Sequence, residues 1–409
     1  MTTTMYDYKA RDRSGRIHDG QVEAPSSAAV VKTLRDRGLM PLKVSERKAS
    51  ALQKEIKIPG LGGKIKQKEL AVMSRQFSTM VYSGLTLIRS LSILEEQSQN
   101  PALKKVIGEV RSKVEQGVSL SAALEEHPKA FSPLYVSMVR AGEVGGALDE
   151  TLARLADTLE GQARLRSQIK SAMAYPVVVL NLIVFIVLAM LVFVVPIFEK
   201  MYNDLGGTLP LPTQALINLS RFITSKWWMI GGVVGGTIFG FRRWKRTEAG
   251  RRRWDAVKLR LPIGGELARK VAISRFARTF AVLSRTGVPV LQALDIVAQT
   301  AGNATVSDAV LDVQSSVKKG ESLSQPLERH DVFPAMVTQM MAVGEETGAL
   351  DAMLGKVADF YDREVEDTVS ALTSLIEPML IVVMGVVVGG ILISLYLPMF
   401  NVANLIQQG

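Results

Sequence analysis

The pattern of apolar and polar positions is dominated by two long runs without a charged residue, at 176–198 and 378–400. A helix rises about 1.5 Å per residue, so either run reaches across a hydrocarbon core about 30 Å thick. A buried helix of a soluble protein is the alternative, but such helices rarely stay free of charge over this length. We therefore predict membrane spans at 174–198 and 376–400. Their expected boundary residues are Pro176, Pro196, Glu377, Pro378 and Pro398.

A shorter apolar stretch predicts a third span, at 223–241. Its most apolar part, 227–241, has only 15 residues, and it reaches the length of a span if the Lys226 side chain extends to the interface. Nine Lys or Arg residues follow between 242 and 260. Basic residues beside a span favour the cytoplasmic side, so they set the orientation of the chain. This position already accounts for their charge, and no nucleic-acid partner is predicted.

The helical segment before each long apolar run occurs twice. Residues 141–149 read AGEVGGALD and residues 343–351 read VGEETGALD, while RQFSTMVYSGLTLIRSLSIL at 75–94 aligns with RTFAVLSRTGVPVLQALDIV at 278–297. The two copies lie 203 residues apart, and 202 apart after one deletion. A module of about 130 residues, a helical domain followed by an outward span, is therefore duplicated.

Each copy is expected to contain about six helices joined by short turns. Apolar residues recur every three or four positions, for example at Leu148, Leu152, Leu155 and Leu159. Gly, Pro, Ser and Asn mark the breaks between these periodic stretches. The long helices after the doubled phrase lead directly into the spans, so movements of the cytoplasmic domains are expected to reach the membrane through them.

The doubled phrase predicts a helix–helix turn with acidic residues on either side of it. Its candidate functional residues are Gly142, Glu143, Gly146 and Asp149 in the first copy and Gly344, Glu345, Gly348 and Asp351 in the second. Glycine favours the end of one helix, and a carboxylate in the first turn of the next favours the helix dipole. Turn geometry with capping is one interpretation, and a carboxylate patch for a partner or a hard cation is the other. Two acids per copy are too few to specify a metal.

The first 47 residues have a different pattern from the helical repeats. Apolar and polar residues alternate on both sides of a turn at 12–15, a short helical stretch follows, and a third strand-like stretch ends the segment. They predict a small ββαβ unit. The predicted organisation is 1–47 N-terminal α+β unit, 48–65 linker, 66–173 first cytoplasmic helical domain, 174–198 first span, 199–222 external (periplasmic) loop, 223–241 second span, 242–265 basic juxtamembrane segment, 266–375 second cytoplasmic helical domain, 376–400 third span and 401–409 external tail.

Composition narrows the functional classes. The chain of 409 residues has a net charge of +10, no cysteine and three scattered histidines. It lacks a phosphate-binding loop and a HExxH motif, so we predict neither an enzyme nor a bound cofactor or metal. A transporter built from a tandem repeat is an alternative to a scaffold. Proton- or ion-coupled transporters usually place Asp, Glu, Lys, Arg or His inside their spans, whereas these two apolar runs contain none of them, which favours the scaffold.

The residues then resemble a known family, the inner-membrane platform proteins of type IV pilus assembly and type II secretion (PilC/GspF). The similarity covers nearly the whole chain, including YDYKARDRSGRIHDGQVEA, MVRAGEVGGALDETL, VGEETGALDAML and EPMLIVVMGVVVGGILISLYLPMF. The doubled GE-x-x-G-x-LD signature before a Pro-bounded span is specific. The stretch KVADFYDREVEDTVSALTSLIEPM looks more like the pilus branch.

This resemblance implies a mainly α-helical, multi-pass protein of the bacterial inner membrane. It implies two repeated six-helix cytoplasmic domains, three spans and a homo-oligomer. The implied partners are a cytoplasmic hexameric assembly or retraction ATPase, pilin or pseudopilin transmembrane helices, other inner-membrane assembly proteins and the lipid bilayer. The family has no catalytic residues, and its contact positions would include Gly142, Glu143, Gly344 and Glu345.

Overall fold

The computed structural model describes residues 4–11, 17–24, 26–36, 38–46, 64–204, 209–262 and 264–406. The chain divides into two compact units, Met1–Lys64 and Ile65–Gly409. The predicted turn at 12–15, most of the predicted linker and the last residues of the predicted tail lie outside the described residues.

The first unit is a small antiparallel sheet covered by one helix. Its elements are β1 (Thr4–Arg11), β2 (Ile17–Ala24), α1 (Ser27–Asp36) and β3 (Met40–Glu46), and the strand order is β2-β1-β3. Tyr6, Val30 and Leu34 are buried between helix and sheet. The element order is that of the predicted ββαβ unit.

The second unit begins with the helices of the first copy. They are α2 (Gln67–Tyr82), α3 (Leu87–Gln97), α4 (Pro101–Glu115), α5 (Leu120–Glu125), α6 (Pro133–Gly145) and α7 (Leu148–Ala172). Several starts are fixed by side chains that accept from the first free backbone N–H groups, as Thr86, Asn100, Ser119 and Ser132 do. These caps fix where α3, α4, α5 and α6 begin, so the turns before them are short.

The second copy repeats this order. Its helices are α13 (Gly264–Arg285), α14 (Val290–Thr300), α15 (Ala304–Val317), α16 (Ser324–Glu328), α17 (Ala335–Thr347) and α18 (Leu350–Ile406). The two copies contact each other where α6 meets α13 and α14, and their apolar cores are continuous. Phe77 and Leu155 lie in the part from the first copy, Phe280 and Val357 in the part from the second.

In each copy the first helix packs along the last one. Arg75 on α2 binds Asp157 and Glu160 on α7, and Arg278 on α13 binds Asp359 and Asp362 on α18. The four acids stand at equivalent positions of the repeat. The same ion-pair network therefore fixes the long helix in both copies.

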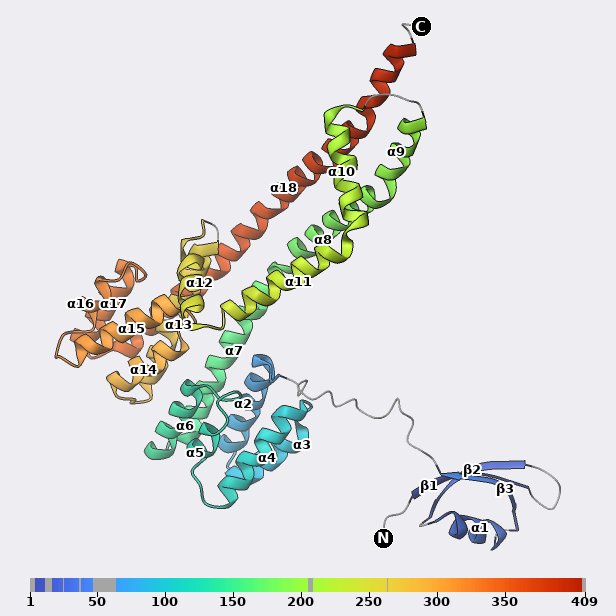
Figure 1. The fold of residues 1–409 in the computed structure, drawn as a ribbon. Helices are drawn as coiled ribbons and strands as arrows, with labels where there is room; N and C mark the ends of the chain where they lie inside the picture. Colours follow the sequence, from blue (N-terminus) through green and yellow to red (C-terminus); the bar gives the residue numbers. More distant parts are fainter. Residues whose placement is uncertain are drawn as a thin grey trace. The chain divides into compact units, whose positions relative to one another are not determined.

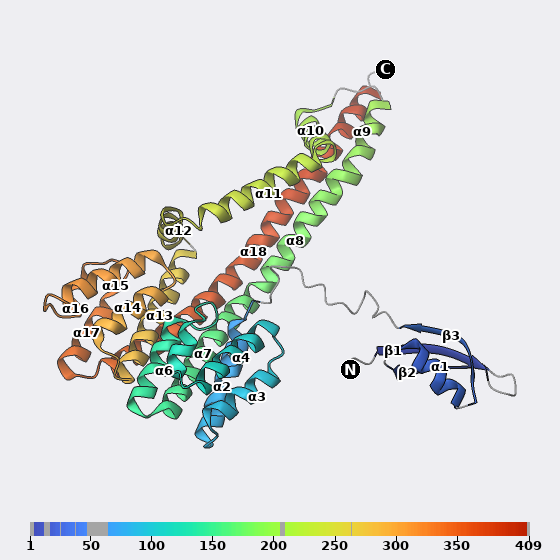
Figure 2. The same cartoon turned by 60° about the horizontal axis from the view of Figure 1, so that its bottom comes forward.

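Both long helices continue into the apolar runs. After α7, a single turn residue leads to α8 (Ala174–Ala189), a π-helical turn η1 (Met190–Val194) and α9 (Val195–Asp204), whereas α18 is one helix of 57 residues. Figure 1 and Figure 2 show α8 and α18 side by side. Within the described residues, two helical stretches are long and apolar enough to cross a membrane, Leu148–Tyr202 and Leu350–Pro398.

The remaining helices connect the two copies. They are α10 (Leu211–Ser225), α11 (Trp227–Trp244) and α12 (Glu248–Arg260). The predicted third span falls largely on α11, which is not among the two stretches because arginines at its end, tryptophans and glycines dilute its hydropathy. No residue of α11 is buried, and Trp227 and Phe239 are 72% and 70% exposed. Figure 2 shows α11 diverging from α8 and α18.

One sequence prediction needs correction. The segment 199–222, predicted as a loop, is helical over the end of α9 and most of α10, because an apolar stripe on α10 packs against η1 and α18. Pro378 and Pro398, predicted as span boundaries, both lie inside the continuous helix α18. Membrane-type helices tolerate proline where neighbouring groups satisfy the carbonyl that loses its N–H partner.

Candidate functional site

The doubled turn has the same backbone geometry in both copies. Gly146 and Gly348 follow α6 and α17 in the left-handed conformation, with φ of 68° and 69°, which residues with a Cβ adopt only with strain. One turn earlier, Gly142 and Gly344 are buried at the helix crossing. A Cβ on Gly142 would lie 2.8 Å from the Thr151 hydroxyl, so glycine lets the two helices meet closely.

The two glutamates of the phrase cap a short helix in their own copy. The Glu143 carboxylate accepts from the backbone N–H groups of Leu120, at 2.5 Å, and Ser121, at 2.9 Å. Glu345 directs both oxygens to the single N–H of Leu323, at 2.9 and 3.0 Å. A carboxylate at these free N–H groups also interacts favourably with the helix dipole. These contacts support the capping interpretation of the phrase.

The two aspartates differ between the copies. Asp351 accepts from Arg285 at 3.0 Å, and this arginine holds the pKa of Asp351 below its ordinary value. The position equivalent to Arg285 in the first copy is Tyr82, and Asp149 is exposed. Within the described residues, no group of three acidic or histidine side chains is placed to hold a metal ion.

The far ends of the two spans are joined by hydroxyl groups from α10. In α18, Pro398 has no N–H for the Ser394 carbonyl, and the Thr213 hydroxyl donates to that carbonyl at 2.5 Å. In η1 the Val195 N–H donates to the Met190 carbonyl. One residue further on, the same i→i−5 pattern would pair the Leu191 carbonyl with residue 196, which is a proline and has no N–H.

The Ser220 hydroxyl donates to the free Leu191 carbonyl instead, at 2.5 Å. Tyr202 adds a bond to the Leu395 carbonyl at 2.6 Å. Pro196 and Pro398, predicted as boundary residues, thus mark the places where α10 attaches to both spans.

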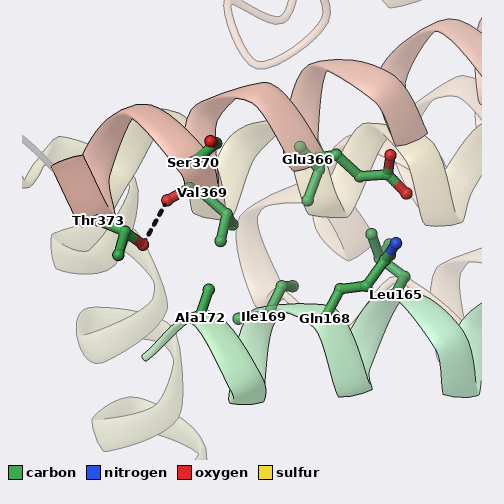
Figure 3. A pocket seen from close by; sticks show the side chains of 9 residues that line it. Leu165, Gln168, Ile169, Ala172, Glu366, Val369, Ser370 and Thr373 are labelled. Carbon is green, nitrogen blue, oxygen red and sulfur yellow. Dashed lines mark hydrogen bonds between the residues drawn. The ribbon is translucent and has the colours of Figure 1, made fainter. Parts of the chain in front are cut away.

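The near ends of the spans border an open cleft. Its walls come from α7, α13 and α18, its volume is about 1090 Å³, and seven Arg or Lys side chains line it against three Asp or Glu. A smaller hollow of about 300 Å³ adjoins it and shares Leu165, Gln168, Ile169 and Glu366 with it. Figure 3 shows α7 and α18 facing each other across this hollow. Its last lining residues, Ala172 and Thr373, come about one helical turn before Pro176 and Pro378 in the sequence.

Sequence reasoning placed the doubled turn but missed both the acceptor role of its glutamates and the cleft. The capping contacts span 22 or 23 residues along the chain, and no local pattern announces them. One signal was available: in both copies a Gly-x-Ser-Leu-Ser segment precedes the capped helix, at 117–121 and 320–324. The cleft had no such signal, because its cations come from different helices and look like ordinary surface charge.

The fold and these sites define a class: a helical membrane protein built from a tandem repeat whose last helix continues into the apolar run. The family model described as type II secretion system protein F matches residues 73–196 and again 276–398, and the model of its N-terminal domain matches 1–45. The chain belongs to this family, which confirms the resemblance seen in the sequence. The two matches begin 203 and end 202 residues apart, as the repeat does.

Named relatives come from both branches of the family. The chain is 45% identical to the type IV pilus assembly protein PilC of Myxococcus xanthus, over 99% of this chain and 96% of the relative. It is 44% identical to PilC of Thermus thermophilus, over 97% and 98%. The type II secretion system protein F of Vibrio cholerae is 34% identical, over 98% and 99%.

Proposed function

We propose that this chain is the inner-membrane platform of a type IV pilus assembly machine, coupling a cytoplasmic hexameric ATPase to the insertion of pilin into the fibre or its extraction. The observation that carries the proposal is the 45% and 44% identity to two PilC proteins over nearly the whole chain. The second candidate is the equivalent platform of a type II secretion system. It has weaker support, because its relatives named type II secretion system protein F are 34% and 35% identical. In both roles the chain is a scaffold without its own catalysis.

The proposed topology has three spans and a cytoplasmic bulk. Two six-helix domains, 66–173 and 266–375, lie on the cytoplasmic side, and α10 on the outer side. The middle span is α11, supported by its apolar side chains, which nothing else in the described chain covers. The basic residues of α12 follow it directly, as expected at a cytoplasmic end.

Labelling of single cysteines tests this topology, because the chain has no cysteine of its own. Gln214→Cys on α10 is expected to react with an impermeant maleimide in intact cells, and Arg251→Cys on α12 only after lysis. Val386→Cys, inside the last span, should stay unreactive in both. Reaction of Arg251→Cys in intact cells would contradict the three-span arrangement.

The proposed mechanism uses the long helices as rigid connections. Helix α18 runs from Leu350, beside the doubled turn, through the last apolar run without interruption. A rotation imposed on the second helical domain would therefore move the span directly. In the first copy, α7 and α8 are separated by one residue, Met173.

Functional replacement in a strain lacking the gene tests the role and the mechanism together. The wild-type chain should restore surface pili, and the ATPase should co-purify with it. Replacing Ser171 and Ala172 by two glycines weakens the helix between domain and span by about 1 kcal/mol per residue. This variant should retain the ATPase but form few pili, whereas two alanines at the same positions should behave as wild type.

Either of two results would contradict the proposal. Normal piliation of the strain that lacks the gene would contradict the pilus role. If that strain failed to secrete an enzyme but still formed pili, the type II secretion platform would be favoured. Normal piliation by the double-glycine variant would remove the rigid-connection mechanism but leave the platform role intact.

A further inference from the structure

The cleft between α7, α13 and α18 has more positive charge than its own acids neutralise. Of its three acids, Asp362 already binds Arg278 and Asp157 already binds Arg75. Four of the cations lining the cleft make no ion pair with a carboxylate in the described residues: they are Arg164, Arg166, Lys170 and Arg275.

Two of these cations line the cleft from different helices and interact unfavourably with each other. Arg275 on α13 and Arg166 on α7 repel, and the contact of Arg166 within the cleft is a hydrogen bond of 3.3 Å to the neutral Gln67 side chain. Arg275 is open to the cleft, but the protein around it lowers its pKa, and repulsion from Arg166 acts in the same direction. An anion bound near both guanidinium groups would offset this repulsion and accept charge-assisted hydrogen bonds from them.

The membrane end of the same cleft is apolar. Met173, Ala174 and Val177 line it there, and Val177 is 51% exposed. They lie at the start of α8, and from Pro176 to Val195 the chain has no ionisable side chain. A ligand in the cleft therefore meets cations at one end and a lipid-facing helix at the other.

We propose that this cleft binds the headgroup of an anionic phospholipid, with the phosphate between Arg166 and Arg275 and the acyl chains along the start of α8. The shared chemistry is a phosphate group, and the apolar end favours a lipid over a soluble phosphate compound. Basic pockets at the cytoplasmic ends of membrane helices commonly hold such headgroups. The volume of about 1090 Å³ accommodates one headgroup with the first part of its chains. The inference rests on the membrane location of α8 and on no pilus partner.

The test uses the full chain purified in a mild detergent. Phosphatidylglycerol and phosphatidylcholine are added as mixed micelles in parallel, and sn-glycerol 1-phosphate is the soluble arm. Thermal unfolding reports stabilisation, and native mass spectrometry counts retained lipids. Phosphatidylglycerol should raise the unfolding temperature and stay bound, whereas phosphatidylcholine and millimolar glycerol phosphate should not.

Two pairs of variants separate the cleft from general surface attraction. Arg166→Gln with Arg275→Gln should weaken phosphatidylglycerol binding about thirtyfold, since each basic residue near anionic lipid contributes about fivefold. The same two residues changed to Lys should retain most binding. Arg251→Gln with Arg253→Gln removes equal charge from exposed positions on α12, outside the cleft, and should leave the affinity within about twofold.

The glutamine pair also has an internal check on folding. It removes two like charges, so its unfolding temperature without lipid should not fall. If the unfolding temperature of the glutamine pair does fall, the lysine pair takes its place: it keeps both charges in a folded chain and tests whether their position in the cleft determines lipid binding.

Several outcomes would overturn the proposal. Equal stabilisation by phosphatidylcholine would remove the headgroup specificity, and full stabilisation by glycerol phosphate would replace the lipid by a soluble ligand. Unchanged binding in the glutamine pair, or equal weakening in the α12 pair, would place the lipid elsewhere. A change of oligomeric mass without a change in lipid count would make the cleft a contact between two copies. None of these results affects ATPase binding or piliation, so the proposed function stands or falls separately.

Discussion

Glu143→Ala and Glu345→Ala are expected to reduce the folding stability by different amounts, although the two glutamates occupy the same position of the repeat. Glu143 accepts from two backbone N–H groups at the start of α5, and Glu345 from one at the start of α16. A hydrogen bond to a charged group contributes about 1.5–3 kcal/mol when buried. Both carboxylates are half-buried, so hydrogen bonds to water replace part of this free-energy contribution. We expect losses of about 2 kcal/mol for Glu143→Ala and about 1 kcal/mol for Glu345→Ala.

Hydrogen–deuterium exchange of the full chain in detergent measures this locally. The measurement follows the backbone amides that lose their glutamate partner, those of Leu120, Ser121 and Leu323, in peptides covering 117–125 and 320–328. A loss of about 2 kcal/mol accelerates exchange about thirtyfold, and about 1 kcal/mol about fivefold. Glu346→Ala, next to Glu345 but exposed, is the matched control and should change neither peptide.

The order of the two effects is the decisive result. Equal acceleration in both copies, or a larger effect of Glu345→Ala, would show that the count of N–H partners does not govern the cost. No acceleration at all would remove the capping role and return these glutamates to the partner-contact interpretation. A loss of ATPase binding in Glu345→Ala, with exchange unchanged, would establish that interpretation directly.

Three further predictions follow from the structure. Gly146→Ala and Gly348→Ala should each cost about 1 kcal/mol in thermal unfolding, because both positions have a left-handed backbone. Tyr202→Phe removes one hydrogen bond between α9 and α18 and should lower stability by about 1 kcal/mol in the same assay. Arg75 lowers the pKa of Glu160, so their mutual stabilisation is present above the ordinary glutamate pKa and is lost as the pH falls through the lowered one. Arg75→Met should remove that part of the acid dependence, which begins as the pH falls below the ordinary glutamate pKa, measured as unfolding temperature against pH.

The sequence was most informative where structure follows from local periodicity. Leu152 and Leu155 repeat at helical spacing and are both fully buried on α7. Gly146 and Gly348 stand where a helix must end, and both have the positive φ that their position requires. The charge-free runs identified the membrane helices because lipid solvation depends on composition alone.

The sequence was less informative where one segment determines the structure of another. Residues 211–222 look like part of a loop beside a proline-rich turn, but Ile217 packs with Leu191 and Leu395 from two other helices. The hydroxyl that satisfies the Ser394 carbonyl before Pro398 comes from Thr213, 181 residues earlier. Such a contact leaves no periodic trace in the chain.

The attachment of α10 to both apolar helices couples the two halves of the repeat. Thr213 and Ser220 lie two helical turns apart on α10: Ser220 binds η1 beside Pro196, and Thr213 binds α18 beside Pro398. A displacement that enters through either helical domain is thus shared by the far ends of both apolar helices. The duplicated segment accordingly encodes a yoked pair: without the second half, the Thr213 hydroxyl would lose its acceptor, and without α10 the Ser394 carbonyl would lose its donor.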